Sequence, residues 1–284
     1  MRGMRHFQDK VVFITGGSSS IGLETARMLA VSGAHVMIFG RDMKKLDDAY
    51  SEIETQKVLN SQRIMAMQMD VADHKDVDRK IVRAVQEFGA PDILINSAGL
   101  GHADYFDDIT HEKFDEVIRI NLYGTRNVIA AILPSMKPRG GHIVNVSSML
   151  GLIGIFGYSA YSTSKFAVVG LSECLRSELK PYNIHVAVYC PPEVDTPMTD
   201  YMVTSSPPET RALVRMTGLI SVRKAARILL NGIEKKQFLI VAGFLSKWSY
   251  LNKRLCPGLT SMIMDLVVKL ARITRNKELH GKRD

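Results

Sequence analysis

The chain has 284 residues, of which 46% are hydrophobic and 23% are charged. These proportions are those of a folded globular protein and exclude a chain that is disordered throughout. The formal net charge of +8 admits an anionic cofactor, an anionic membrane surface or nucleic acid as a partner. The sequence contains no basic motif interleaved with aromatic residues, so we expect no nucleic-acid partner.

The N-terminal region and the cysteines bear on the location of the protein. Residues 1–10 are polar and lead directly into an apolar run, without the apolar segment of a secretory signal. Cys174, Cys190 and Cys256 lack the spacing of a metal site, so we expect no bound metal. Both features favour a reduced, cytoplasmic location over secretion.

Short apolar runs alternate with amphipathic segments along most of the chain. The predicted strands cover residues 11–15, 34–39, 64–69, 91–96, 142–147 and 184–190. The predicted helices cover residues 21–32, 42–57, 73–88, 111–136 and 159–181. This alternation predicts an α/β fold, a Rossmann-type doubly wound parallel sheet with helices on both faces.

The turn after the first predicted strand, residues 15–22, is rich in glycine and serine. Glycine lets the backbone approach a pyrophosphate closely, and the free amides of a helix N-terminus complement its charge. The candidate cofactor-binding residues in this turn are Gly16, Ser18, Ser19, Ser20, Ile21 and Gly22. Such turns also occur for structural reasons alone, so the assignment depends on the residues downstream.

Polar residues stand at the ends of the second and third predicted strands, where ligands of such sheets bind. Arg41, with Lys45 one helical turn later, can grip a 2′-phosphate that a carboxylate would repel. We therefore predict NADPH/NADP+ as the cofactor, the alternative being a solvated arginine. Asp70 and Val71 suit the amino group of adenine, although an aspartate at a strand end can instead cap the next helix.

A candidate catalytic group follows the fifth predicted strand. Tyr161 and Lys165 are four residues apart and share one helix face, and Ser148 stands at the adjacent strand end. An ammonium near a phenol lowers the pKa of the phenol, which makes proton exchange feasible at neutral pH. The Ser148 hydroxyl can polarise a carbonyl oxygen, and hydride from a nicotinamide would complete a reduction. A Tyr-x-x-x-Lys pair alone is usually only a solvated helix face.

Together these motifs resemble those of the short-chain dehydrogenases/reductases, over about residues 8–200. The matching pieces are Thr15–Gly22, Asn96-Ser97-Ala98-Gly99, Asn121, Ser148, Tyr161 with Lys165, and Pro191–Thr196. The resemblance implies that Tyr161 is the general acid/base, that Lys165 lowers its pKa and binds the ribose, and that Ser148 orients the substrate. Asn121 would hold a water that links Lys165 to solvent.

The same resemblance completes the cofactor site and implies an oligomer. The further cofactor-binding residues that it implies are Asn96, Ala98, Gly99 and Thr196, beside Tyr161 and Lys165. Members of the family commonly pair through two long helices, here predicted at residues 111–136 and 159–181, so a homodimer or homotetramer is expected.

Three residues depart from the family pattern. Ser20 stands in place of a glycine, Ser97 in place of a second asparagine, and Pro192 in place of the glycine of a Pro-Gly pair. Ser20 can still offer its hydroxyl to a phosphate, provided that its backbone need not adopt a positive φ. These departures bear on cofactor affinity and not on the class of protein.

A finer resemblance favours the 3-ketodihydrosphingosine reductases. It is carried by residues 15–19, Arg41 with Lys45, residues 191–197 and residues 208–211. It implies NADPH-dependent reduction of the long-chain lipid 3-ketosphinganine to sphinganine at a membrane. The alternatives are reduction of another hydrophobic ketone, such as a steroid or a 3-ketoacyl chain, and a silent NADPH-binding scaffold. The complete catalytic set argues against a scaffold.

The C-terminal residues differ from the rest. We expect a catalytic domain over residues 1–243 and a basic amphipathic segment over residues 244–284, with nine basic and three acidic residues. Apolar residues recur at helical spacing between Leu259 and Ile273, but the stretch is too short and too charged to span a membrane. It could lie on the cytosolic face of an anionic bilayer and admit a lipid substrate. Packing on the core or on another subunit is the alternative.

Overall fold

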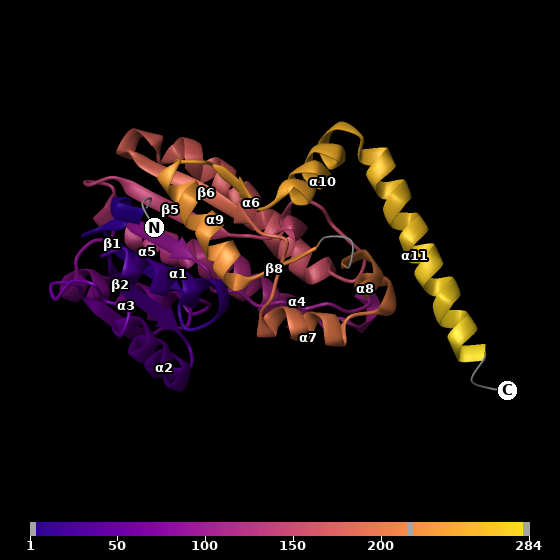
Figure 1. Ribbon diagram of the computed structural model, residues 1–284, viewed down its shortest axis with the longest axis horizontal. Coiled ribbons are helices and arrows are strands. Elements are labelled where there is room, and N and C mark those ends of the chain that lie inside the picture. Colours follow the sequence, from indigo (N-terminus) through magenta and orange to yellow (C-terminus); the bar gives the residue numbers. More distant parts are fainter. Residues whose placement is uncertain (1–3, 215–217, 281–284) are drawn as a thin grey trace.

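The fold is an α/β structure around one parallel sheet, seen in a computed structural model that describes residues 4–214 and 218–280 (Figure 1). The sheet has the order β3-β2-β1-β4-β5-β6-β9. Its strands are β1 (Val11–Thr15), β2 (His35–Gly40), β3 (Ile64–Gln68), β4 (Ile93–Asn96), β5 (Gly141–Val146), β6 (Ile184–Cys190) and β9 (Leu239–Val241). The predicted Rossmann-type sheet is confirmed, because the order reverses between β1 and β4.

Helices cover both faces of this sheet. They are α1 (Ser20–Val31), α2 (Met43–Glu54), α3 (His74–Phe88), α4 (His111–Ile118), α5 (Gly124–Met136), α6 (Ser159–Glu178), α7 (Pro197–Ser205), α8 (Pro208–Val214), α9 (Val222–Glu234), α10 (Phe244–Leu255) and α11 (Pro257–His280). A separate short pair is formed by β7 (Glu193–Val194) and β8 (Leu219–Ile220).

The strand residues alternate between two cores. Val12 and Ile14 point into the core under α1, α2 and α9, whereas Phe13 points into the core under α3 and α5. Val36 and Met37 of β2 repeat the alternation. Each strand is therefore apolar on both faces, which explains the continuous apolar runs in the sequence.

Two predicted helices end or bend where the backbone changes. The helix predicted over residues 111–136 is divided into α4 and α5 by a π-helical turn at Arg119–Tyr123. The helix predicted to residue 181 ends at Glu178 and is followed by a 3-10 turn at Lys180–Tyr182. Pro181 lies in that turn, where its missing amide proton prevents a further helical hydrogen bond.

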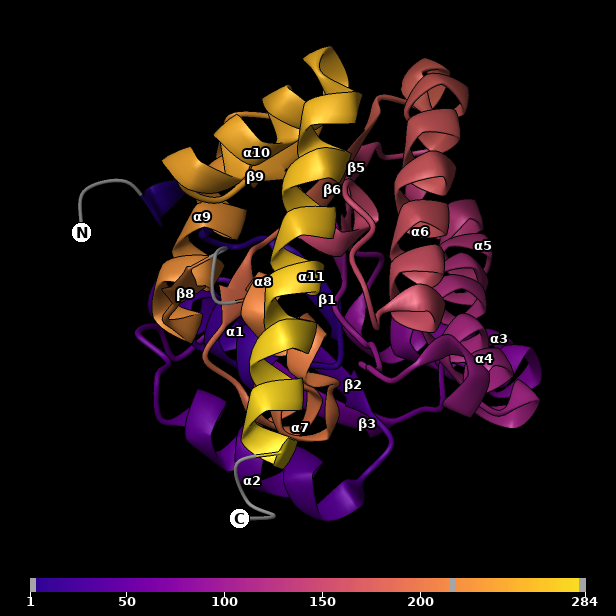
Figure 2. The same cartoon turned by 90° about the vertical axis from the view of Figure 1, so that its right-hand side faces the viewer.

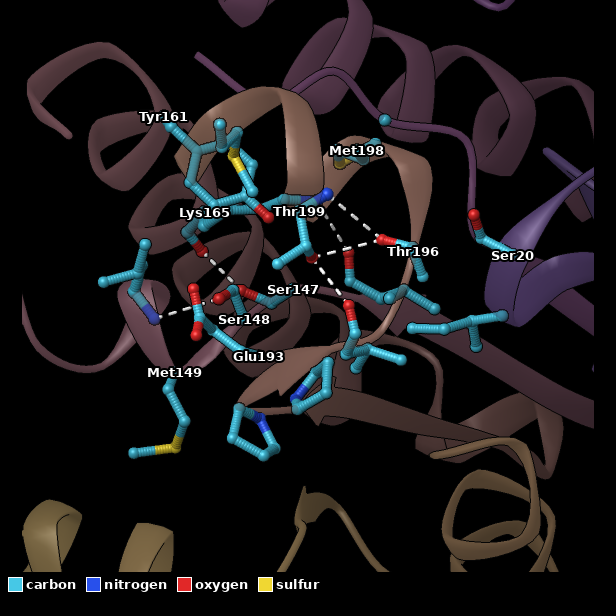
Figure 3. A pocket seen from close by; sticks show the side chains of 18 of the residues that line it. Ser20, Ser147, Ser148, Met149, Tyr161, Lys165, Glu193, Thr196, Met198 and Thr199 are labelled. Carbon is cyan, nitrogen blue, oxygen red and sulfur yellow. Dashed lines mark hydrogen bonds between the residues drawn. The ribbon is translucent and has the colours of Figure 1, made fainter. Parts of the chain in front are cut away.

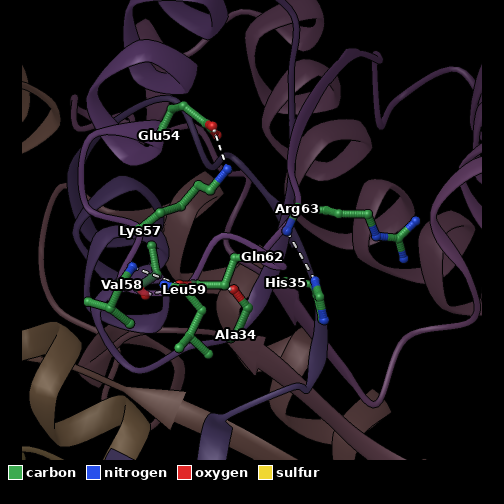
Figure 4. A network of polar contacts seen from close by, with 9 residues as sticks. Ala34, His35, Glu54, Lys57, Val58, Leu59, Gln62 and Arg63 are labelled. Carbon is green, nitrogen blue, oxygen red and sulfur yellow. Dashed lines mark hydrogen bonds and ion pairs between the residues drawn. The ribbon is translucent and has the colours of Figure 1, made fainter.

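A buried glutamine fixes the loop between α2 and β3 (Figure 4). Gln62 accepts hydrogen bonds from the amides of Val58 and Leu59 at 2.7 and 2.8 Å. Its side-chain amide donates to the carbonyls of Ala30 and Ala34 at 2.8 and 3.0 Å. One side chain thus ties the loop to the end of α1 and the start of β2.

The C-terminal helices α10 and α11 lie outside the sheet and its covering helices. Figures 1 and 2 together show α11 crossing the end of the molecule formed by α7 and α8. Arg272 of α11 donates through Nε to the buried carboxylate of Glu209 in α8 at 3.2 Å, and its guanidinium lies 5.5 Å from the ring centroid of Phe156. Within the described residues, every helix is too short or too polar for a membrane span.

Candidate active site

A cavity of about 190 Å³ opens at the carboxyl ends of the strands (Figure 3). One side is formed by the small residues of the β1–α1 turn and of the segment after β4. The other side carries apolar side chains from several loops and helices, namely Met149, Leu150, Ile155, Met198, Met202 and Val214. The cavity therefore joins a polar, backbone-rich half to an apolar half.

The β1–α1 turn leaves room for a ligand by packing its glycines tightly. Gly16 has a φ of +66°, and a Cβ there would lie 2.8 Å from the Cα of Ala98. A Cβ on Gly22 would overlap the carbonyl oxygen of Gly16. Ser19 stands at the N-cap of α1 without making a side-chain capping bond, so it leaves the first amides of the helix to a ligand. This cradle fits a dinucleotide pyrophosphate.

Ser20 does not meet the condition stated for it above. Its backbone has a φ of +50°, in the left-handed region that favours glycine. That conformation costs a non-glycine residue about 1–2 kcal/mol. Ser20 and Ile21 both line the cavity, so the strained residue lies at the edge of the cofactor half.

Arg41 and Lys45, which were predicted to bind the 2′-phosphate, follow β2 and lie outside the cavity. Gly17 donates its amide to the carbonyl of Phe39 at 3.2 Å, which places the β1–α1 turn beside β2. The Ser18 hydroxyl lies against Gly40, 3.0 Å from the position of a Cβ there. Arg41 and Lys45 are exposed beyond this contact. The structure thus places the end of β2, which is followed by Arg41, beside the glycine turn, and Lys45 lies in the first turn of α2.

Asp70 and Val71 follow β3 and have different environments. Asp73, and not Asp70, caps α3, so the capping alternative for Asp70 is wrong. The Asp70 carboxylate accepts the amide of Ala72 at 3.0 Å. Val71 is buried, and its carbonyl accepts the side-chain amide of Asn127 at 3.1 Å.

Asn96 supports the site without lining it. Its side-chain nitrogen donates to Oδ1 of Asn145 at 2.9 Å, and Asn145 in turn donates to the Ser172 hydroxyl at 2.9 Å. This buried chain of amides joins β4, β5 and α6. Ala98 and Gly99, which follow β4, do line the cavity.

Three of the four predicted catalytic side chains, Ser148, Tyr161 and Lys165, meet in the cavity. The Lys165 ammonium lies 5.5 Å from the ring centroid of Tyr161 and donates to the carbonyl of Val146 at 3.0 Å. Ser147 donates its hydroxyl to the Lys165 carbonyl at 2.9 Å, which ties α6 to the end of β5. Ser148 follows directly and also lines the cavity.

Burial decides the ionisation of the Tyr161–Lys165 pair. It raises the pKa of Tyr161 to about 12, while a hydrogen bond from the Ser148 hydroxyl acts in the opposite direction. Burial also lowers the pKa of Lys165 to about 8. Burial therefore dominates the pKa of Tyr161, and the expected lowering of this pKa by Lys165 stays a prediction. A phenol with so high a pKa is protonated at neutral pH, the form that a proton donor needs.

Asn121 lies in the π-helical turn between α4 and α5. Its Oδ1 accepts the Leu100 amide at 2.7 Å, and its Nδ2 donates to the Leu100 carbonyl and the Ser164 hydroxyl, both at 2.9 Å. A Cβ on Gly99 would lie 3.3 Å from Asn121 Oδ1 and 3.4 Å from Lys165 Nζ. Asn121 and Lys165 thus flank Gly99. Single π turns of this kind are frequent at functional sites.

Thr196 and the residues before it close the cavity on the side of β7. Thr196 caps α7 through its hydroxyl, which accepts the Thr199 amide at 3.2 Å, and it lines the cavity. Glu193 and Tyr158 also line it, although sequence analysis assigned neither of them to the site. Glu193 belongs to the unusual Pro-Pro-containing stretch, which was the available signal. Nothing in the local sequence distinguishes Tyr158.

Comparison with known proteins identifies the family. A family model described as short chain dehydrogenase matches residues 10–206. The chain belongs to the short-chain dehydrogenase family. It is therefore an oxidoreductase that interconverts carbonyl and hydroxyl groups, and its cofactor is a nicotinamide dinucleotide.

Individual relatives confirm the finer resemblance. A 3-dehydrosphinganine reductase from Danio rerio is 36% identical over 229 residues, which span 80% of this chain and 69% of the relative. A 3-ketodihydrosphingosine reductase from Dictyostelium discoideum is 35% identical over 266 residues, spanning 88% and 79%. A solved short chain dehydrogenase/reductase from Burkholderia phymatum, in complex with NAD, shares the fold with a TM-score of 0.74 at 22% identity, over 83% of this chain and 89% of that one.

Proposed function

We propose that this protein reduces the 3-keto group of 3-ketosphinganine to sphinganine, with NADPH as the hydride donor. The observation that carries the proposal is a cavity in which Ser148, Tyr161 and Lys165 meet and whose other half is apolar. A long-chain amino ketone has a polar head that suits the first half and a hydrocarbon chain that suits the second. The relatives named as reductases of this lipid support the same substrate class.

The chain's own residues supply the proton and the orientation. NADPH, when bound, supplies the hydride that adds to the carbonyl carbon. Tyr161 gives its phenolic proton to the carbonyl oxygen as the negative charge develops there, and Ser148 hydrogen-bonds the same oxygen. The C=O double bond thereby becomes a C–OH group. Lys165, whose pKa burial lowers to about 8, is suited to return a proton to Tyr161.

We propose that the proton reaches Lys165 along the side of Asn121. The two side chains flank Gly99, where a side chain would close the space between them. A water held there would join Lys165 to solvent. We also assign the preference for NADPH over NADH to Arg41 and Lys45, because both are exposed and follow β2, whose end lies beside the glycine turn.

We propose that residues 1–243 are the catalytic domain and that residues 244–284 hold it on the cytosolic face of a membrane. Both C-terminal helices expose large apolar side chains, namely Phe244, Leu245, Trp248, Leu251 and Leu255 in α10 and Leu259, Met262, Ile263, Leu266, Leu270 and Ile273 in α11. The segment also carries a net charge of +6, which suits an anionic lipid surface. The contact of α11 with α8, which contributes Val214 to the apolar half of the cavity, supports this proposal.

A homodimer or homotetramer remains part of the proposal. Tyr123, at the π turn before α5, and Phe166, in α6, are large apolar residues that stay exposed on the two long helical segments. Light scattering coupled to gel filtration measures the assembly directly, and a monomer at micromolar concentration would reject this pairing.

The test of the function is an assay of the full-length protein with NADPH and 3-ketosphinganine in detergent micelles. We expect loss of NADPH absorbance and an equal amount of sphinganine. NADPH binding without any turnover of this lipid would reject the substrate while leaving the family and cofactor in place. Steroid and 3-ketoacyl substrates in the same assay then test the alternative ketones, and failure with every ketone would favour a scaffold.

A further inference from the structure

Glu193 is an acidic side chain in the wall of the substrate cavity. It lies in β7, directly after Pro191 and Pro192, and Figure 3 shows its carboxylate on the same side of the cavity as the Ser148 hydroxyl. Among the residues that the structure describes, none forms an ion pair or a hydrogen bond with this carboxylate. Lys165, the cation that shares the cavity, is instead bonded to the Val146 carbonyl.

The surroundings of Glu193 disfavour a lone negative charge. Pro191, Pro192 and Tyr158 are buried around the same cavity wall, and burial raises the pKa of Glu193 to about 7. A half-buried carboxylate without a partner is stabilised by any cation that enters the cavity. Glu193 is therefore poised to bind a positively charged group of a ligand.

The position of the carboxylate indicates which ligands could contact Glu193 and the catalytic hydroxyls at the same time. In the proposed reaction Ser148 and Tyr161 hydrogen-bond the carbonyl oxygen of the substrate, and Glu193 lines the same cavity. In a 2-amino ketone the ammonium and the carbonyl are on adjacent carbons, so their partners must stand close together. A ketone without an amino group has nothing to offer Glu193.

We infer that Glu193 is a specificity-determining residue, which binds the ammonium group of a 2-amino ketone and so orients its carbonyl toward Ser148 and Tyr161. This inference rests on the proposed function and deepens it. Charge-assisted hydrogen bonds contribute about 1.5–3 kcal/mol, which corresponds to a selectivity of roughly 10- to 100-fold. The enzyme thus favours the free aminolipid over an N-acylated or deaminated lipid of the same chain length.

The test compares two substrates that differ only in the amino group. These are 3-ketosphinganine and the 1-hydroxy-3-ketone of the same chain length, each in the same detergent with NADPH. Wild type is expected to favour the amino ketone by roughly 10- to 100-fold in kcat/KM. Glu193→Gln is expected to lose this preference, because kcat/KM should fall roughly 10- to 100-fold more for the amino ketone than for the deaminated ketone. Glu193→Asp keeps the charge and is expected to retain most of the preference.

Several outcomes would overturn the inference. An equal loss on both substrates would mean that Glu193 acts through Tyr161 or the fold. A Gln variant that still prefers the amino ketone, or a wild type without preference, would remove the ammonium site. NADPH binding equal to wild type shows that the Gln variant is folded.

A binding measurement separates this inference from the proposed function. Sphinganine and the matching 1,3-diol without the amino group are titrated into the protein with NADP+, for wild type and Glu193→Gln. If neither ketone is reduced but sphinganine binding still depends on Glu193, the proposed reaction fails and the ammonium site stands. If sphinganine binding is the same in both proteins, the ammonium site fails whatever the turnover.

Discussion

The sheet and the C-terminal helices use the same apolar residue types in opposite ways. Leu46 in α2 is fully buried against the sheet, whereas Leu266 in α11 is 55% exposed. Phe39 in β2 is fully buried, whereas Trp248 in α10 is 54% exposed. Apolar partners inside the described chain cover the first set completely, whereas about half of each side chain in the second set stays uncovered.

The contacts that hold the two regions explain the difference. The sheet is joined to its helices by two continuous apolar cores. By contrast, α11 contacts α8 through an ion pair between Arg272 and Glu209, and the side chain of Arg272 is largely exposed. Apolar surface left in water is unfavourable by roughly 25 cal/mol per Å². Helical spacing of apolar residues therefore indicates that one face of a helix is covered. It does not indicate whether the protein core, a lipid surface or another subunit covers that face.

The largest expected effect is on the catalytic step, which takes place at the edge of the sheet and not in the C-terminal helices. Tyr161→Phe removes the proton donor and keeps the ring, so kcat for 3-ketosphinganine should fall by about 10²–10⁴-fold. The dissociation constant for NADPH, measured by fluorescence, should stay close to that of wild type. Retained turnover would remove Tyr161 from the mechanism.

The comparison of the two regions predicts a large difference in stability. Ile14→Ala in β1 leaves a cavity in the core and should lower the free energy of unfolding by about 2–5 kcal/mol. Leu266→Ala, its exposed counterpart in α11, should change that free energy by less than about 0.5 kcal/mol. Urea denaturation measures both variants. An equally large loss for Leu266→Ala would show that α11 packs as part of the core.

The preference for NADPH over NADH should depend on residues at the carboxyl ends of the strands and not on residues at the opposite end of the sheet. Arg41→Asp is expected to weaken NADPH binding by roughly 10- to 100-fold and to leave NADH binding little changed. The control is Arg139→Asp, which makes the same charge change in the exposed loop before β5, at the opposite end of the sheet. A similar effect of both variants would indicate net charge in place of a 2′-phosphate contact.

The smallest effect concerns the stability of the ligand-free protein at different pH values. Burial raises the pKa of Glu193 from 4.5 to about 7, so the folded chain binds the proton more tightly than the unfolded chain. The stabilising contribution is therefore complete below about pH 4.5 and is lost as the pH rises to about 7. Relative to Glu193→Gln, the melting temperature of wild type should fall across this interval. A constant difference would mean that Glu193 is not desolvated.

The fold could be predicted because its signals are local. Val12, Phe13 and Ile14 are apolar on both faces of a strand, which is visible in the sequence as a short apolar run. The spacing of Tyr161 and Lys165 likewise places both on one helix face whatever surrounds them. These features need no knowledge of the tertiary contacts.

The remaining features depend on residues that are far apart in the sequence. Burial of Tyr161 raises its pKa, and this burial comes from several separate loops around the cavity. Asn96 bonds Asn145, forty-nine positions later, and this partner is not visible in the sequence around either residue. The Pro-Pro-containing stretch draws attention to Glu193, but only the folded chain brings its side chain into the cavity that Ser148 lines.

The most direct test of the account measures reduction of 3-ketosphinganine by NADPH in anionic vesicles and in detergent micelles. Wild type is compared with a variant that carries Leu266→Ser and Leu270→Ser, which keeps Arg272 and its contact with Glu209. We predict that the variant loses activity in vesicles and keeps the wild-type rate in detergent. If wild type and the variant have equal rates in vesicles, or if the variant loses the same activity in both media, α11 does not deliver the lipid substrate from the membrane to the catalytic domain.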